Sequence, residues 1–216
     1  MKTKFALFDI DNTLFRGDSL FSLYRFGVKR HPVYLLTLPL LALAIVLTLL
    51  HLLPIEWCKA LFYSPLASLS EQDRDEFFDG VLMKRRIPKS WEALLQAKAD
   101  GYHVLLVSAS PELYLRPSLT RCLCDGLIGS RLRTRKDGRP SPLPDGKNCA
   151  GYEKVRRIGA YCQTQGLTID KKHSIGFSDS DRDRHMLALV GTATRVTKQG
   201  RHIPYMTRKK VISQTP

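Results

Sequence analysis

The feature that most constrains this chain is its start, where the apolar run Phe5–Phe8 leads directly into Asp9 and Asp11. A short apolar run of this kind predicts a buried β-strand. Residues two apart on a strand lie on the same face, so both carboxylates are predicted to point at one place. Neighbouring carboxylates repel each other unless a cation lies between them. The pattern favours a carboxylate nucleophile beside a general acid and a hard divalent metal. The alternative is a polar strand end closed by an Asx turn.

Charge and cysteine content narrow the class of protein. The 216 residues suffice for one hydrophobic core with a small inserted unit. The formal net charge of +14 indicates an acidic partner, which is nucleic acid, an anionic membrane or a phosphorylated substrate. The five cysteines include no Cys-x-x-Cys pair, so we expect reduced thiols in the cytosol and neither a disulfide framework nor a zinc site. No signal peptide is expected, because Phe5–Phe8 is too short and runs into acidic residues.

Apolar runs and helical patterns alternate along the rest of the chain. The predicted strands are Phe5–Phe8 and residues 102–107, 127–136, 174–177 and 193–196. The predicted helices cover residues 20–30, 91–99, 111–123, 152–164 and 185–190, a further helix starts near residue 70, and residues 140–151 are expected to be loop. This alternation predicts an α/β fold with a doubly wound, Rossmann-like parallel sheet.

Residues 33–50 form an unusual apolar segment. They carry no charge, and nine of the eighteen are leucine. This is close to the length of a membrane-spanning helix, and the alternative is a buried helical hairpin. A small helical unit has little surface with which to cover a helix that is apolar all round, so we favour membrane contact. Pro39 is expected to kink this helix and Pro54 to end it.

The flanks of the apolar segment indicate how it meets a bilayer. If the residues before and after it share one site, both flanks must lie on the same side of the membrane. Basic residues at 29–31 and 84–86 place both flanks on the cytoplasmic side. We therefore expect a re-entrant hairpin or an interfacial bundle that dips into one leaflet. Its second leg is predicted over residues 55–69, with Trp57 and Tyr63 as interface anchors.

Polar side chains follow three of the predicted strands. They are Asp9 with Asp11, Ser108, and Asp179 with Asp183, and Lys154 lies between the last two along the chain. Strand ends of a doubly wound sheet gather along one edge. Carboxylates there suit Mg²⁺, and a hydroxyl with a lysine forms a pocket for phosphoryl oxygens. Taken singly, Lys154 is typical of a surface helix and Ser108 of a helix cap.

The ordered set of motifs resembles the four motifs of the haloacid dehalogenase superfamily. The motifs are Phe8-Asp9-Ile10-Asp11-Asn12-Thr13, Val107-Ser108-Ala109-Ser110, Lys154, and Ser178-Asp179-Ser180 followed by Asp183. The helical insert after the first motif resembles the cap of subclass IB, the phosphoserine-phosphatase-like group. More narrowly, residues 151–155, residues 176–180 and the leucine-rich insert resemble the phosphatidylglycerophosphatase C group.

This resemblance implies a domain division and a catalytic set. The catalytic core comprises residues 1–17 and 87–216, and residues 18–86 form a helical cap with a membrane-associating segment at 33–55. Asp9 becomes an aspartyl phosphate, and Asp11 acts as general acid and then as general base. Mg²⁺ is bound by Asp9, Asp11 through its backbone carbonyl, and Asp179.

The resemblance also implies the residues that hold phosphate and support the site. Ser108, Ala109 and Lys154 bind the phosphate, and Lys147 is a second candidate for the lysine. Thr13, Ser180 and Asp183 are the supporting residues, and Asp183 orients Lys154 or a metal-bound water.

The implied function is a Mg²⁺-dependent phosphatase at the cytoplasmic face of a membrane. It removes the terminal phosphate of phosphatidylglycerophosphate to give phosphatidylglycerol, so its partners are an anionic phospholipid and the bilayer. One alternative is a soluble phosphatase of a small phosphomonoester. The other is a basic membrane or nucleic-acid-binding protein without catalysis, which the charge alone supports. No aromatic platform accompanies the basic residues at 131–139, so we expect no nucleic acid.

Overall fold

The computed structural model describes residues 2–205. The strands are β1 (Lys2–Thr3), β2 (Phe5–Phe8), β3 (His103–Pro111), β4 (Gly126–Thr134), β5 (Pro140–Asp145), β6 (Thr168–Ile169), β7 (Ile175–Ser178), β8 (Thr192–Val196) and β9 (His202–Pro204). The α-helices are α1 (Ser19–Arg30), α2 (Leu38–Leu49), α3 (Ile55–Tyr63), α4 (Glu71–Phe77), α5 (Pro88–Ala99), α6 (Glu112–Leu115), α7 (Pro117–Thr120), α8 (Tyr152–Thr164) and α9 (Arg184–Leu187). Short 3₁₀ or π segments extend or join several of these helices.

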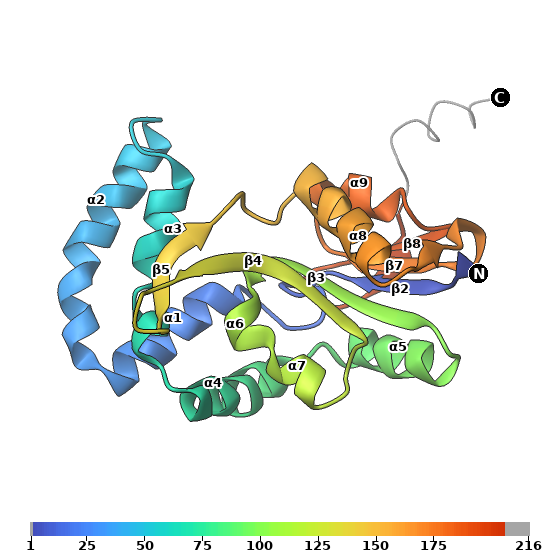
Figure 1. The fold of residues 1–216 in the computed structure, drawn as a ribbon, viewed down its shortest axis with the longest axis horizontal. Helices are drawn as coiled ribbons and strands as arrows, with labels where there is room; N and C mark the ends of the chain where they lie inside the picture. The colour runs from blue at the N-terminus through green and yellow to red at the C-terminus, as the bar shows by residue number, and fades with distance from the viewer. Residues whose placement is uncertain (1, 206–216) are drawn as a thin grey trace.

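Within this range, seven strands form one sheet in the order β5-β4-β3-β2-β7-β8-β9. The five central strands run parallel, and β5 and β9 pair antiparallel at the two edges. Strand β2 is central, with Phe8 opposite Leu106 on one side and Phe177 on the other. Helices cover both faces of the sheet, as Figure 1 shows. The predicted doubly wound α/β fold is confirmed.

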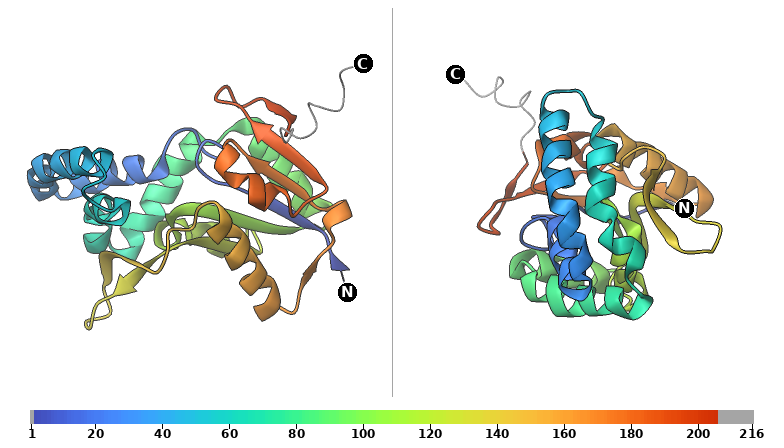
Figure 2. Two further views of the ribbon diagram at one scale, coloured as in Figure 1. Left: turned by 90° about the horizontal axis from the view of Figure 1, so that it is seen from above. Right: turned by 90° about the vertical axis from the view of Figure 1, so that its left-hand side faces the viewer.

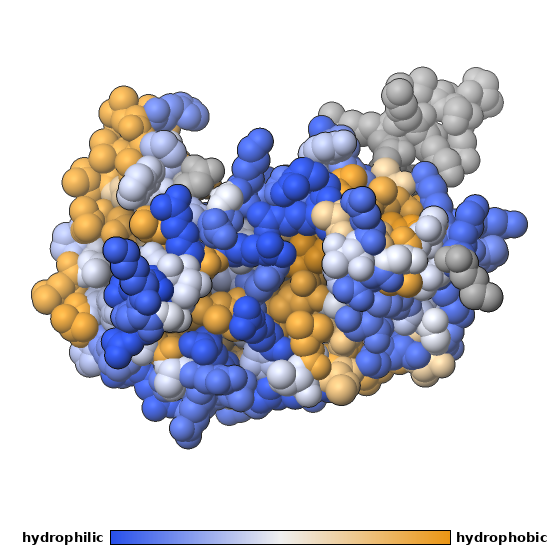
Figure 3. All heavy atoms as spheres, viewed as in Figure 1, coloured by the Kyte–Doolittle hydropathy of each residue, from blue (hydrophilic) through white to orange (hydrophobic). Residues whose placement is uncertain are grey.

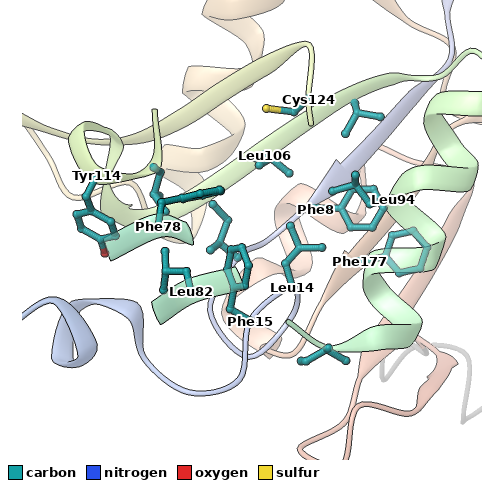
Figure 4. Close-up of a cluster of buried hydrophobic side chains, with 14 of the residues drawn as sticks. Phe8, Leu14, Phe15, Phe78, Leu82, Leu94, Leu106, Tyr114, Cys124 and Phe177 are labelled. Atoms are coloured by element: carbon teal, nitrogen blue, oxygen red, sulfur yellow. The ribbon is translucent and has the colours of Figure 1, made fainter. Parts of the chain in front are cut away.

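The sheet is buried on both faces, as the continuous apolar runs of its central strands predict. Phe8 and Leu106 point to one face, where they pack in a cluster with Leu94 of α5 (Figure 4). Leu7 points to the other face and packs with Ile158 of α8. This alternation follows from the pleat of the strands. It fixes the register of β2, and therefore the position of the polar residues that follow it.

The predicted loop at residues 140–151 is partly wrong, because β5 occupies its first half. β5 and β4 form an antiparallel hairpin around a turn at Asp137 and Gly138. Pro140 and Pro144 both lie in β5. An edge strand tolerates proline because only one of its sides must donate hydrogen bonds. The proline content that indicated a loop therefore marks an edge strand.

The helix predicted over residues 111–123 is also shorter and divided. Strand β3 runs on to Pro111, and the helical residues that follow form α6 and α7. Pro117 begins α7 and cannot donate a backbone hydrogen bond to continue α6. The predicted helix at 185–190 likewise reduces to α9.

Residues 18–86 are helical in this structure. Asp18 caps α1 by accepting a hydrogen bond from the Phe21 backbone N–H, and Ser70 caps α4 in a capping box. Helices α2 and α3 lie side by side and project from the rest of the molecule (Figure 2). Their shared core with α1 is small and includes Tyr24, Leu41 and Cys58. The division into core and cap stays a prediction.

The outer side of this helical hairpin is exposed and apolar. Among the described residues, one helical stretch, Pro32–Leu49, is long and apolar enough to span a membrane, with a mean hydropathy of 2.3 and 11% of its residues buried. Leu36 is 78% exposed and Leu49 is 73% exposed. Figure 3 shows apolar residues gathered over α2. The predicted second leg is present as α3, and membrane contact itself stays a prediction.

The structure bears on two details of the predicted hairpin. Pro39 lies in the first turn of α2, directly after the 3₁₀ segment Pro32–Thr37, so the regular α-helix begins at this proline. Tyr63 is only 2% exposed and is no interface anchor, whereas Trp57 is 56% exposed. The sequence after Asp183 is basic and predicts a solvated arm or a surface anchor, and three of its basic residues, Arg208, Lys209 and Lys210, lie outside the described residues.

Candidate active site

The carboxyl ends of β2 and β7 form the floor of the candidate site. The Asp9 backbone N–H donates a hydrogen bond to the Phe177 carbonyl at 3.0 Å, which joins the two strand ends. After Asp11 the chain turns at Asn12, whose φ of 56° lies in the left-handed region that asparagine tolerates. The Asn12 side chain accepts a hydrogen bond from the Gly17 N–H at 2.9 Å. This bond spans five residues, so it is not the Asx turn of the alternative prediction, in which the side chain bonds the backbone two residues on.

A buried lysine joins the two strand ends electrostatically. Lys154, in the first turn of α8, places Nζ 2.6 Å from Asp9 Oδ1 and 2.8 Å from Asp183 Oδ2. All three side chains are buried. Lys147 is exposed and lies outside this cluster. Of the two candidate lysines, Lys154 is the one that contacts Asp9.

Asp11 lies beside Asp9 and has partners of its own. Its Oδ1 accepts a hydrogen bond from the Ser19 backbone N–H at the start of α1, at 2.8 Å. Its Oδ2 accepts one from Ser110 Oγ at 2.7 Å. The Ser19 hydroxyl lies 3.1 Å from Ser110 Oγ and 2.8 Å from the Tyr114 hydroxyl oxygen. A buried chain of hydroxyls therefore holds the Asp11 carboxylate.

Thr13 and Asp183 tie the polar loops together. Thr13 Oγ1 donates to Asp9 Oδ2 at 3.3 Å and accepts from the Asp179 backbone N–H at 3.0 Å. The Ser178 hydroxyl donates to Asp183 at 2.7 Å. Asp183 thus accepts from both Lys154 and Ser178, so its position fits the predicted orienting role.

Burial controls the ionisation of these groups. Burial raises the pKa of Asp9 to about 7, although Lys154 opposes this shift. The pKa values of Asp11 and Asp179 are also raised by burial, and Asp183 adds to the effect on Asp179. Burial by itself would lower the pKa of Lys154, but Asp9 and Asp183 hold it above its ordinary value. The site therefore contains more carboxylates than one lysine can neutralise, which favours an additional cation.

A cavity of about 330 Å³ lies over this cluster. Asp9, Asp11 and Asp179 form its floor, and α3 contributes Lys59 and Tyr63 to its wall. A larger cavity, of about 620 Å³, lies between β4 and α8 and contains none of the predicted carboxylates. We place the candidate site in the smaller cavity, because the reactive groups converge there.

Of the three predicted phosphate-holding residues, Ala109 and Lys154 line the cavity and Ser108 does not. Ala109 and Ser180 line the cavity, whereas Ser108 is 1% exposed and lies behind the wall. Ser108 Oγ accepts a hydrogen bond from the Ser110 N–H at 3.0 Å and shapes the loop. Ser110 is also buried, at 5% exposed, but it lines the cavity, and the sequence analysis assigned it no role. Ser110 lies two residues after Ser108 in the same motif, and this position was the sequence feature that could have indicated a role in the site.

Sequence reasoning also missed the residues that close the cavity from the side of α3. Lys59 Nζ donates to Asn148 Oδ1 at 2.9 Å, across 89 residues of sequence. Tyr63 also lines the cavity. Neither α3 residue belongs to a motif, and both lie in a helix predicted only as the second leg of an apolar hairpin. Only the folded chain indicates their position.

The donor set fits a divalent cation that keeps part of its water shell. No group of three or more histidine, cysteine, aspartate or glutamate side chains is placed to hold a metal within residues 2–205. Asp9 and Asp179 nevertheless line the same cavity. The Asp11 carboxylate accepts hydrogen bonds from Ser19 and Ser110. The backbone carbonyl of Asp11 is therefore the group of this residue that is expected to bind the metal. Two carboxylates, a carbonyl and water are oxygen donors of the kind that Mg²⁺ takes.

Comparison with known proteins agrees with this arrangement. The family model described as haloacid dehalogenase-like hydrolase matches residues 6–188. The chain belongs to the haloacid dehalogenase-like hydrolase family. Protein CicA of Caulobacter vibrioides is 35% identical to this hydrolase over 93 residues, which are 43% of the chain and 40% of the relative. The match therefore spans about two fifths of the length of that curated relative.

Solved structures share the fold of this hydrolase. A protein of unknown function from Bordetella pertussis Tohama I superposes with a TM-score of 0.73 at 21% identity, covering 89% of both chains. A probable phosphoserine phosphatase from Vibrio cholerae has a TM-score of 0.64 at 17% identity, covering 89% of this chain and 55% of its own. A phosphoserine phosphatase with an analogue of its phospho-aspartyl intermediate has a TM-score of 0.56 at 18% identity, covering 89% and 86%.

Proposed function

We propose that this hydrolase is a Mg²⁺-dependent phosphatase that uses Asp9 as its nucleophile. The observation that carries the proposal is the buried Asp9–Lys154–Asp183 cluster, with Asp11 beside it, on the floor of one cavity. A lysine in contact with Asp9 favours the ionised form of the nucleophile and opposes the effect of burial. The phosphoserine phosphatases among the structural neighbours support the same reaction class.

The reaction proceeds in two displacements. Asp9 attacks phosphorus, the bond from phosphorus to the leaving oxygen breaks, and Asp11 gives that oxygen its proton. Asp11 then takes a proton from water, which attacks phosphorus and releases phosphate from Asp9. Lys154 offsets negative charge on the nucleophile and on the phosphoryl group. The raised pKa of Asp11 suits a group that starts as an acid.

Asp9, Asp179 and the Asp11 carbonyl would hold Mg²⁺. When bound, the ion neutralises charge on the phosphoryl oxygens and on the carboxylates. Thr13 contacts both the Asp9 side chain and the Asp179 backbone. It therefore fixes the position of the two carboxylate-bearing loops relative to each other. The Ala109 segment lines the cavity beside them and is placed to meet the phosphoryl oxygens.

For the substrate we propose phosphatidylglycerophosphate, hydrolysed to phosphatidylglycerol at the cytoplasmic face of a membrane. Three observations support a lipid substrate: the exposed apolar surface of α2, the contribution of α3 to the cavity, and the net charge of +14. The narrower likeness to the phosphatidylglycerophosphatase C group, within subclass IB, supports the same choice. A basic protein is attracted to anionic lipid, at about 1 kcal/mol for each basic residue near the surface.

A small soluble phosphomonoester such as phosphoserine is the second candidate, which the structural neighbours favour. The deciding experiment measures phosphate release from phosphatidylglycerophosphate, phosphoserine and p-nitrophenyl phosphate, with Mg²⁺ and with EDTA. We expect the highest kcat/KM for the lipid, loss of activity in EDTA, and no turnover by Asp9→Asn. A higher kcat/KM for phosphoserine would support the second candidate. Full activity of Asp9→Asn would exclude Asp9 as the nucleophile.

Membrane association is tested separately by sedimentation with phosphatidylglycerol vesicles. Replacing Leu36 and Leu49, which are exposed, by aspartate should leave the fold intact and reduce the vesicle-bound fraction at least tenfold. The matched control replaces Leu95 and Leu119, exposed leucines on α5 and α7, by aspartate and should keep vesicle binding. Equal binding by both double variants would assign membrane attachment to the basic surface.

A further inference from the structure

Helix α3 belongs both to the apolar hairpin and to the wall of the candidate site. Three of its side chains, Ile55, Lys59 and Tyr63, line the cavity that contains the carboxylates. Their four-residue spacing puts them on one face of the helix. At a rise of 1.5 Å per residue, successive members of this row are about 6 Å apart along the helix axis. We call these three residues the α3 row.

The side chains of the α3 row differ in burial and polarity between its buried end, at Tyr63, and its exposed end, at Ile55. Tyr63 is buried, and its pKa is raised first by burial and then by Asp18 and Asp11, so it stands near the general acid. Ile55 is 53% exposed at the start of α3, next to the turn that joins the helix to α2. Lys59 lies between them and is half-buried. The row therefore runs from the catalytic carboxylates, past one cation, to an apolar end.

Lys59 is also held in place by a hydrogen bond to Asn148. Its Nζ donates to Asn148 Oδ1, and the same amide oxygen accepts a hydrogen bond from Ser130 Oγ at 3.0 Å. Asn148 itself lines the cavity. Lys59 is thus held by Asn148, whereas Lys154 is engaged with the nucleophile.

We propose that Lys59 binds a second anionic group of the substrate, in the same cavity as the phosphoryl group that reacts. The proposal rests on the phosphatase function proposed above and specifies its substrate class. The substrate carries a terminal phosphomonoester and a phosphodiester within one molecule. The phosphomonoester lies over Asp9, the phosphodiester meets Lys59, and the rest of the molecule passes Ile55 toward the exposed hairpin.

Electrostatics gives the physical reason for a dedicated cation at this place. The floor carries the carboxylates Asp9, Asp11 and Asp179, which repel any second negative charge on the substrate. Lys154 sits between two of the site carboxylates and is committed to them. The positive charge of Lys59, on α3, offsets this repulsion for a substrate with two phosphates. It gives no comparable advantage to a substrate with one phosphate, so Lys59 determines specificity.

The test compares three substrates with wild type, Lys59→Met and Lys59→Arg. p-Nitrophenyl phosphate has no second anion, glycerophosphoglycerophosphate has a phosphodiester without acyl chains, and phosphatidylglycerophosphate has both. For Lys59→Met, the KM of each two-phosphate substrate divided by the KM of p-nitrophenyl phosphate should rise at least tenfold. Because charge is retained, Lys59→Arg should recover most of this ratio. Since the effect follows the phosphodiester, it should be of similar size with and without acyl chains.

Lys147→Met provides the matched control, because it removes an equal charge next to Asn148 from an exposed position outside the cavity. Its KM ratios should equal those of wild type. An equal rise in KM for all three substrates would mean that Lys59 serves the reacting phosphoryl group, and unaltered ratios would mean that it meets no second anion. Either result overturns the proposal. Wild-type protein that hydrolyses none of the three substrates would instead refute the phosphatase function.

Discussion

At the scale of single residues, Lys154 holds the candidate site together. It is a buried cation between Asp9 and Asp183, and its two contacts span 145 and 29 residues of sequence. A buried ion pair adds little net stability, but removing one partner leaves an uncompensated charge. Removing Lys154 leaves two buried carboxylates without their cation.

We predict that Lys154→Met destabilises the protein by about 3–5 kcal/mol at pH 8 and lowers kcat on the order of 100-fold or more. The loss of stability should be smaller at pH 5, because the uncompensated charge of the buried carboxylates can then be removed by protonation. Urea unfolding at both pH values measures this. Lys147→Met, at an exposed position, should stay within about 0.5 kcal/mol of wild type. Similar effects of the two variants would contradict the role given to Lys154.

Ser110 sets the proton affinity of Asp11 through its hydrogen bond to Oδ2. The bond stabilises the ionised carboxylate and lowers the pKa of Asp11, so Ser110→Ala should raise this pKa further. The first displacement needs protonated Asp11, so the alkaline limb of kcat/KM against pH should move to higher pH. Ser110→Thr, which retains the hydroxyl, should keep the wild-type profile. An unmoved limb in Ser110→Ala would show that the hydroxyl chain does not tune Asp11.

At the scale of elements, close packing of α1 explains how the apolar hairpin is held. Gly27 lies in α1 where a Cβ atom would come within 2.3 Å of the Pro65 Cβ atom. Only glycine lets the two segments approach this closely. This contact fixes the base of the hairpin, although its outer side is exposed.

Gly27→Ala should therefore destabilise the fold by about 1–3 kcal/mol through overpacking. Gly159 in α8 provides the comparison, because a Cβ atom there meets nothing within 4 Å. Gly159→Ala should stabilise the protein by up to about 1 kcal/mol through better helix propensity. Urea unfolding of both variants gives the two values. Changes of the same sign would contradict the packing argument.

Local patterns predicted most elements but misplaced those that contain proline. The parallel strands β2, β3, β7 and β8, and the helices α1, α5 and α8, follow from apolar runs and caps. Strand β5 was predicted as loop, and α6 and α7 as one helix. Proline indicates that a regular hydrogen-bond pattern is interrupted. It does not indicate whether the chain continues as an edge strand, as at Pro140, or as a second helix, as at Pro117.

At the scale of the whole molecule, the sheet brings several negative charges to one edge. The pKa of Asp9 rises from 3.8 to about 7 on burial. A raised carboxyl pKa means that the folded protein binds the proton more tightly than the unfolded chain does. Its contribution to stability is therefore present at low pH and is lost as the pH rises from about 4 to 7. A bound divalent cation should restore stability above that range.

We predict that Mg²⁺ raises the melting temperature at pH 8, and that this increase shrinks as the pH falls through 7 to 5. At a Mg²⁺ concentration ten times its Kd, the gain is about 1.4 kcal/mol. Asp179→Asn should lose most of the increase, because it removes one of the two proposed carboxylate ligands. Thermal unfolding with and without Mg²⁺ measures both effects. An equal increase at pH 5 and pH 8 would place the ion elsewhere.

The sequence by itself determined the central strands, the carboxylates that follow them and the apolar character of residues 33–50. These properties depend on neighbouring residues and on the period of side-chain orientation, which are local. The tertiary structure alone decided that Lys154 meets Asp9, that Ser110 and not Ser108 contacts Asp11, and that Tyr63 faces the site. Each of these depends on contacts between residues far apart in sequence, as in the 99 residues between Ser110 and Asp11. A local pattern carries no information about such distances, because the packing of the whole chain sets them.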